Sequence, residues 1–182
     1  MIKKKICSDP LKIKSKFLNI VNIMKSDLTK LNRIKKRKFC IYTLSLGSLF
    51  GLIIADYIKV EKMAMVVPIY GIAETFWNRN KKDTNNIKSF FQRKNFDLKK
   101  LRKIWSELSL KDAFNKHSLR TKFLLRLSRD DVYLPFNIKR KLLLLLKKKN
   151  IKFISEQRIF SHKLSGVIDA LFPSRIVKFF TA

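Results

Sequence analysis

Residues 39 to 55, FCIYTLSLGSLFGLIIA, contain no charged side chain, although Lys and Arg are spread along the rest of the chain. Seventeen residues are at the lower limit for crossing a hydrocarbon core of about 30 Å. The GSLFG segment has the small-xxx-small spacing of paired membrane helices. The hydroxyls of Thr43, Ser45 and Ser48 lower the hydropathy of the run. We therefore predict an apolar helix at 39–55, buried between neighbouring molecules, with membrane insertion as the less favoured alternative.

The charge of the chain is strongly unbalanced. Its 182 residues include 42 Lys and Arg against 13 Asp and Glu, a formal net charge of +29. Self-repulsion on this scale calls for a polyanionic partner. Nucleic acid and the anionic surface of a membrane both supply such charge, whereas small acidic substrates do not require it.

Glycine, proline and cysteine are scarce. Four glycines and four prolines indicate few tight turns and a mainly helical chain. Cys7 and Cys40 stand alone, without a C-x-x-C pair or a histidine cluster, so the sequence predicts neither a disulfide framework nor a metal site. No cofactor is expected.

Candidate catalytic residues are few. His117 and His162 are the only histidines and lie in different segments, neither with a recognisable Ser and Asp spacing. Asp130 and Asp131 are adjacent, which favours a pair of acidic residues at a helix boundary that form ion pairs with nearby Arg and Lys. A glycine-rich phosphate loop is absent from the sequence. On these grounds the chain is not expected to be an enzyme.

The periodicity divides the chain in two. Residues 1–38 alternate basic and apolar positions, and NRNKKDTNN (78–86) is typical of a linker. Beyond it, residues 97–128 and 137–150 have helical spacing, with Pro135 suited to the first turn of the second helix. We predict a mainly α fold: an extended multi-helix arm over 1–96, then a small helical RNA-binding domain over 97–182 with an irregular C-terminal loop region. The chain is not expected to form an independently compact globule.

From about residue 114 onward, the chain resembles the S-fourteen family of small-subunit ribosomal proteins, in its zinc-free bacterial and organellar form. NKHSLRTKFLLRLSRD is similar to the basic helix of the family, and YLPFNIKRKLLLLLKK to its Leu-Pro turn and second helix. In SHKLSGVIDALFPSRIV (161–177), the spacing of Gly-Val to Ser-Arg-Ile matches the family's loop. The similarity is strongest over 114–179. The family's second loop arginine is replaced by Ser165, a loop glycine by His162, and its tryptophan-ending tail is missing.

The resemblance implies a structural constituent of the mitochondrial ribosome, holding ribosomal RNA and neighbouring proteins in the head of the small subunit during translation. Gly166 would allow close approach to RNA, and Arg175 would bind phosphate or pair with Asp169. The implied rRNA-binding residues are Lys116, Arg120, Lys122, Arg126, Lys139, Arg140, Arg158, His162, Lys163, Gly166, Ser174, Arg175 and Lys178.

Two other functions compete with the ribosomal one. The chain could be a basic single-span subunit of an organellar inner-membrane complex, inserted through 39–55, or a nucleic-acid-binding protein outside the ribosome. The expected location is the mitochondrial matrix. Because the sequence begins at Met1, we expect a protein made in the organelle or imported without cleavage.

Overall fold

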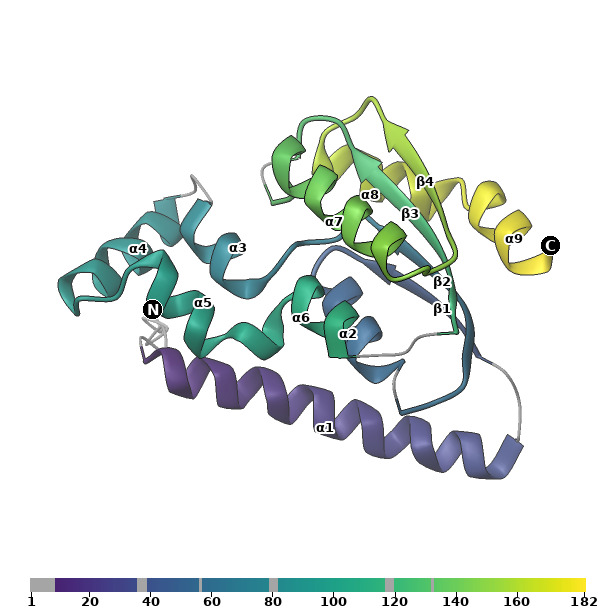
Figure 1. Ribbon diagram of the computed structural model, residues 1–182, viewed down its shortest axis with the longest axis horizontal. Helices are drawn as coiled ribbons and strands as arrows, with labels where there is room; N and C mark the ends of the chain where they lie inside the picture. Colours follow the sequence, from purple (N-terminus) through teal and green to yellow (C-terminus); the bar gives the residue numbers. More distant parts are fainter. Residues whose placement is uncertain (1–8, 36–38, 56, 79–81, 117–119, 132) are drawn as a thin grey trace.

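A parallel β-sheet forms the centre of the molecule. The computed structural model describes residues 9–35, 39–55, 57–78, 82–116, 120–131 and 133–182. In these residues four strands are arranged in the order β1-β2-β3-β4, and each neighbouring pair is parallel (Figure 1). The strands are β1 (Phe39–Leu44), β2 (Val60–Val66), β3 (Lys122–Ser128) and β4 (Phe153–Arg158).

Helices connect the strands, as parallel pairing requires. Between β1 and β2 lies α2 (Gly47–Ile54). The connection from β2 to β3 contains α3 (Ile72–Asn78), α4 (Lys82–Arg93), α5 (Leu98–Ile104), the 3₁₀ helix η1 (Ser106–Leu108) and α6 (Leu110–Lys116). Between β3 and β4 lies α7 (Phe136–Lys148). The chain begins with α1 (Pro10–Lys35) and ends with α8 (His162–Leu171) and α9 (Ser174–Thr181).

The two faces of the sheet are covered by different helices. On β2, Met63 and Met65 pack into the larger core with α2, α6 and α7, whereas Ala64 and Val66 pack into a smaller cluster with Ile176 of α9. This alternation is the two-residue period of a strand buried on both sides. In Figure 1, α8 and α9 accordingly lie behind the sheet and α7 in front of it.

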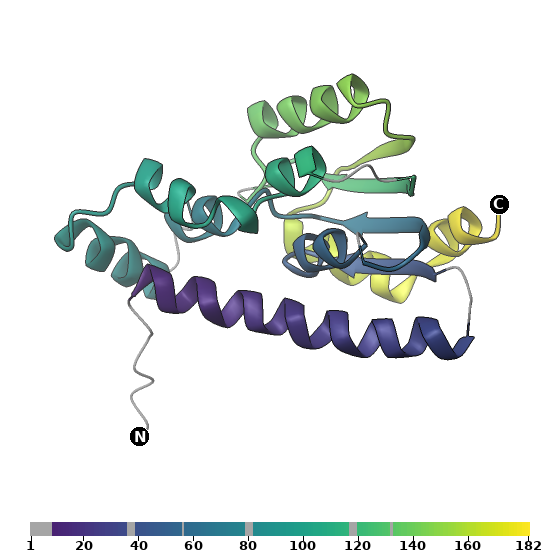
Figure 2. The ribbon, with the colours of Figure 1, turned by 60° about the horizontal axis from the view of Figure 1, so that its bottom comes forward.

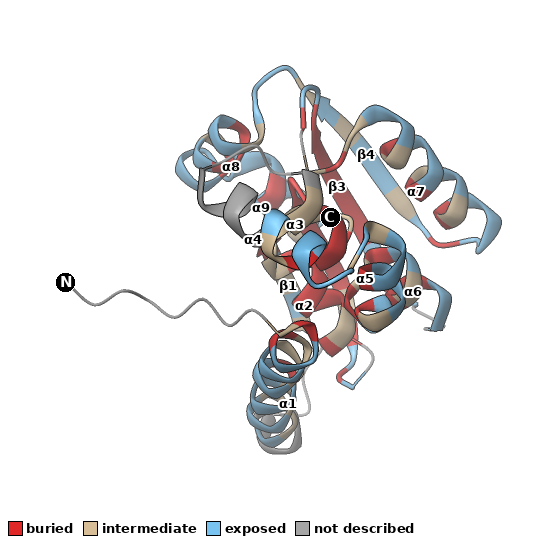
Figure 3. Cartoon of the chain, turned by 90° about the vertical axis from the view of Figure 1, so that its left-hand side faces the viewer, coloured by how far each residue is buried: buried red, intermediate tan, exposed pale blue. Residues whose placement is uncertain are grey.

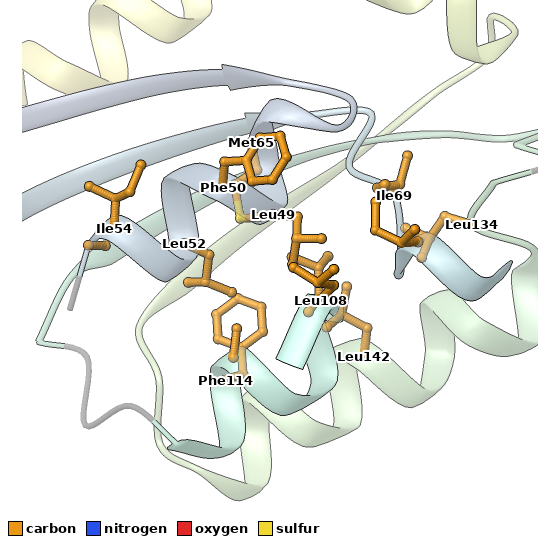
Figure 4. Packing of buried hydrophobic residues seen from close by; sticks show 14 of the residues in the cluster. Leu49, Phe50, Leu52, Ile54, Met65, Ile69, Leu108, Phe114, Leu134 and Leu142 are labelled. Carbon is orange, nitrogen blue, oxygen red and sulfur yellow. The ribbon is translucent and has the colours of Figure 1, made fainter. Parts of the chain in front are cut away.

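The larger core is built mainly around α2. Leu49 and Leu52 of this helix are fully buried, and Figure 4 shows Leu52 beside Phe114 of α6. A Cβ atom on Gly51 would lie 2.6 Å from side-chain atoms of Thr43 and Met63. A residue without a side chain at this position therefore allows α2 to approach the sheet closely.

Helix α1 lies outside α2 and runs along the length of the molecule (Figure 2). Phe17 of α1 contacts the ring of Phe50 at a centroid distance of 5.7 Å, and the indole of Trp105 donates a hydrogen bond of 2.8 Å to the Pro10 carbonyl. Figure 3 shows buried residues concentrated on the strands and α2, while α1 is largely exposed.

The architecture corrects the predicted fold class. A mainly α arm followed by a small RNA-binding domain is wrong, because strands from both sides of residues 96 and 97 join in one compact sheet. The expected helix at 39–55 is also wrong: its first part is β1, and only Gly47–Ile54 is helical. No helix within the described ranges is both long and apolar enough to cross a membrane.

Several local predictions are met in part. The helix expected at 137–150 is α7, at Phe136–Lys148, and it follows Pro135 as predicted. The helix expected over 97–128 is divided into three short helices, α5, η1 and α6, and its C-terminal part is strand β3, which begins at Lys122. The expected linker at 78–86 overlaps the start of α4, and its residues 79–81 lie outside the described residues.

Candidate functional site

Three polar side chains meet at the carboxyl edge of the sheet. Ser45 follows β1 directly, Asp131 follows β3 by three residues, and His162 is the first residue of α8 after β4. The carboxyl ends of parallel strands lie at one edge of a sheet, and ligand and catalytic sites of open α/β sheets are found there. The topology therefore brings together residues up to 117 positions apart.

The three side chains form a continuous hydrogen-bonded chain. Ser45 Oγ lies 2.9 Å from His162 Nε2, and His162 Nδ1 lies 2.9 Å from Asp131 Oδ2. In this arrangement the Ser45 hydroxyl donates to Nε2 and the Nδ1–H donates to the carboxylate. The side chain of Asp131 is 1% exposed and that of His162 is 12% exposed. The geometry is that of a Ser-His-Asp triad.

Ser45 occupies a sharp turn between strand and helix. Its backbone φ is 52°, in the left-handed region that residues with a side chain seldom adopt. Its N–H donates to the Val66 carbonyl at 2.9 Å, which fixes the turn to β2. Thr43-Leu44-Ser45-Leu46-Gly47 matches the G-x-S-x-G nucleophile elbow except that Thr43 replaces the first glycine. The chain order Ser, Asp, His is also the order found with that elbow.

Asp131 is held by the loop that carries it. Its Oδ1 accepts hydrogen bonds from the backbone N–H groups of Tyr133 at 2.8 Å and Leu134 at 3.3 Å, which leaves Oδ2 for His162. The ring of Tyr133 meets the imidazole edge-on, with 4.6 Å between centroids. Both contacts restrict the orientation of His162 relative to Ser45.

Lys139 supports the same loop from α7. Its ammonium is buried and donates to the carbonyls of Ser128 at 2.5 Å and Arg129 at 2.7 Å. Burial lowers the pKa of this ammonium, and the negative charges of Asp131 and Asp130 partly oppose that effect. The ribosomal resemblance implied that Lys139 binds RNA, but it lies inside the protein.

A second cluster of polar side chains joins α8 to strands β3 and β4. Arg126 of β3 is buried and contacts Asp169 through Nε at 2.8 Å and through Nη2 at 2.8 Å, and its Nη1 lies 3.1 Å from Glu156. Arg158 reaches Asp169 at 3.5 Å, and Arg175 pairs with Glu156 at 2.6 Å. Arg126, Arg158 and Arg175, three of the predicted RNA-binding residues, therefore form ion pairs inside one cluster with Asp169 and Glu156. Asp169, the alternative partner predicted for Arg175, pairs with Arg126 instead.

Replacing Asp169 with alanine should lower the free energy of unfolding by about 3–5 kcal/mol, because it leaves the Arg126 guanidinium buried without its closest partner. Urea denaturation followed by circular dichroism measures the change. Asp27→Ala is the control, since Asp27 is exposed and lies 4.0 Å from Lys30, so its removal should change stability by less than about 0.5 kcal/mol. Combining Arg126→Met with Asp169→Leu should recover most of the loss; equal losses in the single and double variants would contradict this assignment.

The other predicted RNA-binding residues do not gather into a site. Lys116 pairs with Asp112 at 2.9 Å, and this hydrogen bond raises the pKa of the Lys116 ammonium. Gly166 is inside α8, and a Cβ atom there would lie 3.0 Å from Leu44 Cδ1, so it brings α8 close to β1. The residues that remain are exposed and dispersed over several elements: Arg120, Lys122, Arg140, Lys163, Ser174 and Lys178. Their binding of RNA stays a prediction.

Sequence reasoning missed Ser45 and Asp131 as functional residues and gave His162 a different role. The available signal was a serine inside the uncharged run 39–55, with Thr43 and Gly47 two positions away on either side, followed along the chain by Asp and His. No group of three or more His, Cys, Asp and Glu side chains in the described part of the chain is arranged to hold a metal ion.

The sequence matches no protein-family model, and no curated protein is significantly similar to it. Solved structures are similar in fold. An esterase from Pyrococcus furiosus superposes with a TM-score of 0.63 at 13% identity over 88% of this chain and 60% of the esterase. An α/β hydrolase from Vibrio vulnificus gives 0.53 at 14% identity, over 78% of this chain and 48% of the hydrolase. A homoserine O-acetyltransferase from Bacillus anthracis gives 0.53 at 13% identity, over 91% and 65%.

These similarities show an α/β-hydrolase-like fold and correct four predictions. The resemblance to the S-fourteen family is wrong, and the ribosomal function and the rRNA and ribosomal-protein partners are wrong with it. The membrane-subunit alternative is not supported. The expectation that the chain is not an enzyme is also corrected, because its structural neighbours include an esterase, a hydrolase and an acetyltransferase. The chain spans only 48% of the hydrolase and 60% of the esterase.

Proposed function

We propose that the chain is a serine hydrolase that cleaves carboxylic esters, with Ser45 as nucleophile, His162 as general base and acid, and Asp131 as the group that orients His162. The observation that carries the proposal is the pair of 2.9 Å contacts from Ser45 through His162 to Asp131. A serine hydroxyl is a weak nucleophile unless an adjacent base removes its proton, and His162 lies where it can do so.

The reaction has two halves. His162 Nε2 accepts the proton as Ser45 Oγ attacks the ester carbonyl, and the buried Asp131 stabilises the imidazolium that forms. His162 then gives the proton to the departing alkoxide, which leaves an acyl group on Ser45. A water molecule, activated by His162 in the same way, attacks the acyl group and releases the carboxylic acid and free Ser45.

The tetrahedral intermediates carry negative charge on the former carbonyl oxygen, and hydrogen-bond donors must meet it. In a nucleophile elbow the N–H of the residue after the serine is one such donor. Here that residue is Leu46, in the turn between β1 and α2. The left-handed conformation of Ser45 sets the direction of this turn, so the strain at Ser45 has a catalytic use.

A fluorophosphonate probe tests the proposal directly. We expect the probe to phosphonylate Ser45, because the reaction requires a serine activated by a base, and intact-mass spectrometry should show one adduct per chain. Trypsin releases residues 39–59 as one peptide, which contains both Ser45 and Ser48. Fragment ions that place the adduct on Ser45 would support the proposal.

Ser48 is the internal control for the labelling. It lies three residues from Ser45, is fully buried, and accepts a hydrogen bond of 3.2 Å from Thr43 instead of facing a base. Ser48→Ala should label as the native chain does, and His162→Ala should not label. Absence of an adduct on Ser45 in the folded native chain, or persistence of the adduct in His162→Ala, would refute the proposal.

A further inference from the structure

Strand β1 is an edge of the sheet, and it carries the proposed nucleophile. In the part of the chain that the structure describes, β1 pairs with β2 alone. Exposed edge strands of natural proteins usually carry charged residues, proline or a bulge that prevents further pairing. Residues 39–44, FCIYTL, contain no charge and no proline, and the irregularity in their register lies at Phe39 and Cys40, at the start of the strand and away from Ser45.

One face of β1 is also uncovered. Tyr42 and Leu44 point to the α8 side of the sheet, where each is 41% exposed, whereas Thr43 on the opposite face is buried. Val167 of α8 is 53% exposed beside them. Leu44, Val67, Val167 and Ala170 line an open hollow of about 400 Å³ that reaches Ser45 and His162.

In the described residues before β1, 9–35, no segment covers this surface. These residues form α1, which packs against α2 and α5, whereas the hollow is lined by Leu44 of β1, Val67 just after β2, and residues of α8. In hydrolases with a nucleophile elbow the second oxyanion donor comes from a loop after an earlier strand of the sheet. No strand precedes β1 in residues 9–35.

We propose that the free edge of β1 and the adjoining hollow form the docking surface for an acidic segment of a second, different polypeptide, which adds a strand to β1. A strand is required because the exposed backbone groups of β1 offer main-chain hydrogen bonds, the mode of binding by β-augmentation. The added strand must also carry apolar side chains on the face that covers Tyr42, Leu44 and Val167. The docking proposal depends on the proposed hydrolase function only in the part of its test that measures ester cleavage.

The net positive charge of the chain favours an acidic partner over a second copy of the same chain. A net charge of +29 strongly opposes association with a second copy of the same chain, whereas an acidic segment would reduce the self-repulsion. Docking beside Ser45 would also place backbone N–H groups near the developing oxyanion.

Site-specific photocrosslinking identifies the occupant. The chain is expressed in its native cells with p-benzoylphenylalanine in place of Tyr42, and in a control in place of Tyr57, which is 45% exposed and lies under Lys25 of α1. We expect crosslinking from position 42 to one acidic polypeptide and none to it from position 57. That polypeptide and the native chain are then purified separately and recombined.

The N–H of Ser45 donates to Val66 beside β2, so by the two-residue alternation of a strand the N–H groups of Tyr42 and Leu44 face the free edge. The recombined proteins should form a one-to-one complex in which the amide hydrogens of Tyr42 and Leu44 exchange at least about tenfold more slowly than in the chain alone. Turnover of p-nitrophenyl butyrate should rise by about 10²–10³, the effect of one oxyanion donor. Leu44→Asp should abolish the protection and the rise in turnover.

Three outcomes would overturn the docking proposal: crosslinking of position 42 to a second copy or to no polypeptide, slow exchange of the Tyr42 and Leu44 amides in the chain alone, or a complex that leaves these two amides unprotected. Fluorophosphonate labelling of Ser45 separates this proposal from the proposed function. A protected one-to-one complex in which Ser45 never labels would refute the hydrolase and keep the docking surface. Labelling of Ser45 without such a complex would support the hydrolase and refute the docking surface.

Discussion

Replacing Ser45 with alanine should reduce the kcat for p-nitrophenyl butyrate by about 10⁴- to 10⁶-fold, to the level left by binding and oxyanion stabilisation alone. The hydroxyl removed is the one 2.9 Å from His162 Nε2, and no acyl-enzyme can form without it. Ser45 is only partly buried, so the fold should survive the change. Initial rates are measured at matched concentrations, and far-ultraviolet circular dichroism confirms folding.

Ser48→Ala provides the matched comparison. It removes a hydroxyl from the same strand-to-helix segment, and it loses a contact with Thr43 that has no part in the proton transfer. Turnover should stay within about threefold of the native value, since one buried hydrogen bond contributes only about 1 kcal/mol to stability. If both variants lost activity equally, disturbance of the elbow would explain the result and the role of Ser45 would be refuted.

The failure to predict β1 has a physical origin in residues 39–55. A short uncharged run is compatible with a buried strand, a buried helix or part of each, because its periodicity does not separate them. The run in fact contains a strand, a turn at Ser45 and a helix. The turn was hidden because Thr43 stands where the elbow pattern has glycine.

Strand β3 shows the same difficulty. Its residues, KFLLRLS, contain no β-branched side chain, and they follow a segment with helical spacing, so propensity favoured a helix. The sheet buries both faces of the strand, and this selects apolar residues at almost every position. Arg126 is tolerated in the strand because Asp169, 43 positions later in the sequence, meets it inside the protein.

The residues of the triad are separated in sequence by 86 and 31 positions, so no local window contains them. The glycine and arginine that suggested a ribosomal loop in 161–177 have structural tasks: Gly166 brings α8 close to Leu44, and Arg175 pairs with Glu156. In contrast, α7 was predictable from one segment, because Pro135, a basic first turn and five leucines are all local signals.

Asp131→Asn should lower kcat by about 10⁴-fold while leaving the folded structure intact, as the equivalent change does in the best-studied Ser-His-Asp triad. The carboxylate at 2.9 Å from His162 Nδ1 accepts the Nδ1–H and so keeps Nε2 free to accept the Ser45 proton. An asparagine can present its amide N–H to Nδ1 instead, which favours the other tautomer and leaves Nε2 protonated. Ser45 would then face a donor in place of a base, and its labelling by the fluorophosphonate should slow in parallel with kcat.

Asp130→Asn is the control for this change, because it removes the same charge one residue earlier from an exposed side chain. Its kcat should remain within about threefold of the native value, since an exposed charge acts on the site through solvent and contributes little. The comparison separates the hydrogen bond to His162 from the general effect of negative charge near Lys139. Equal losses in the two variants would assign the effect to charge, and an unchanged kcat in Asp131→Asn would remove Asp131 from the mechanism.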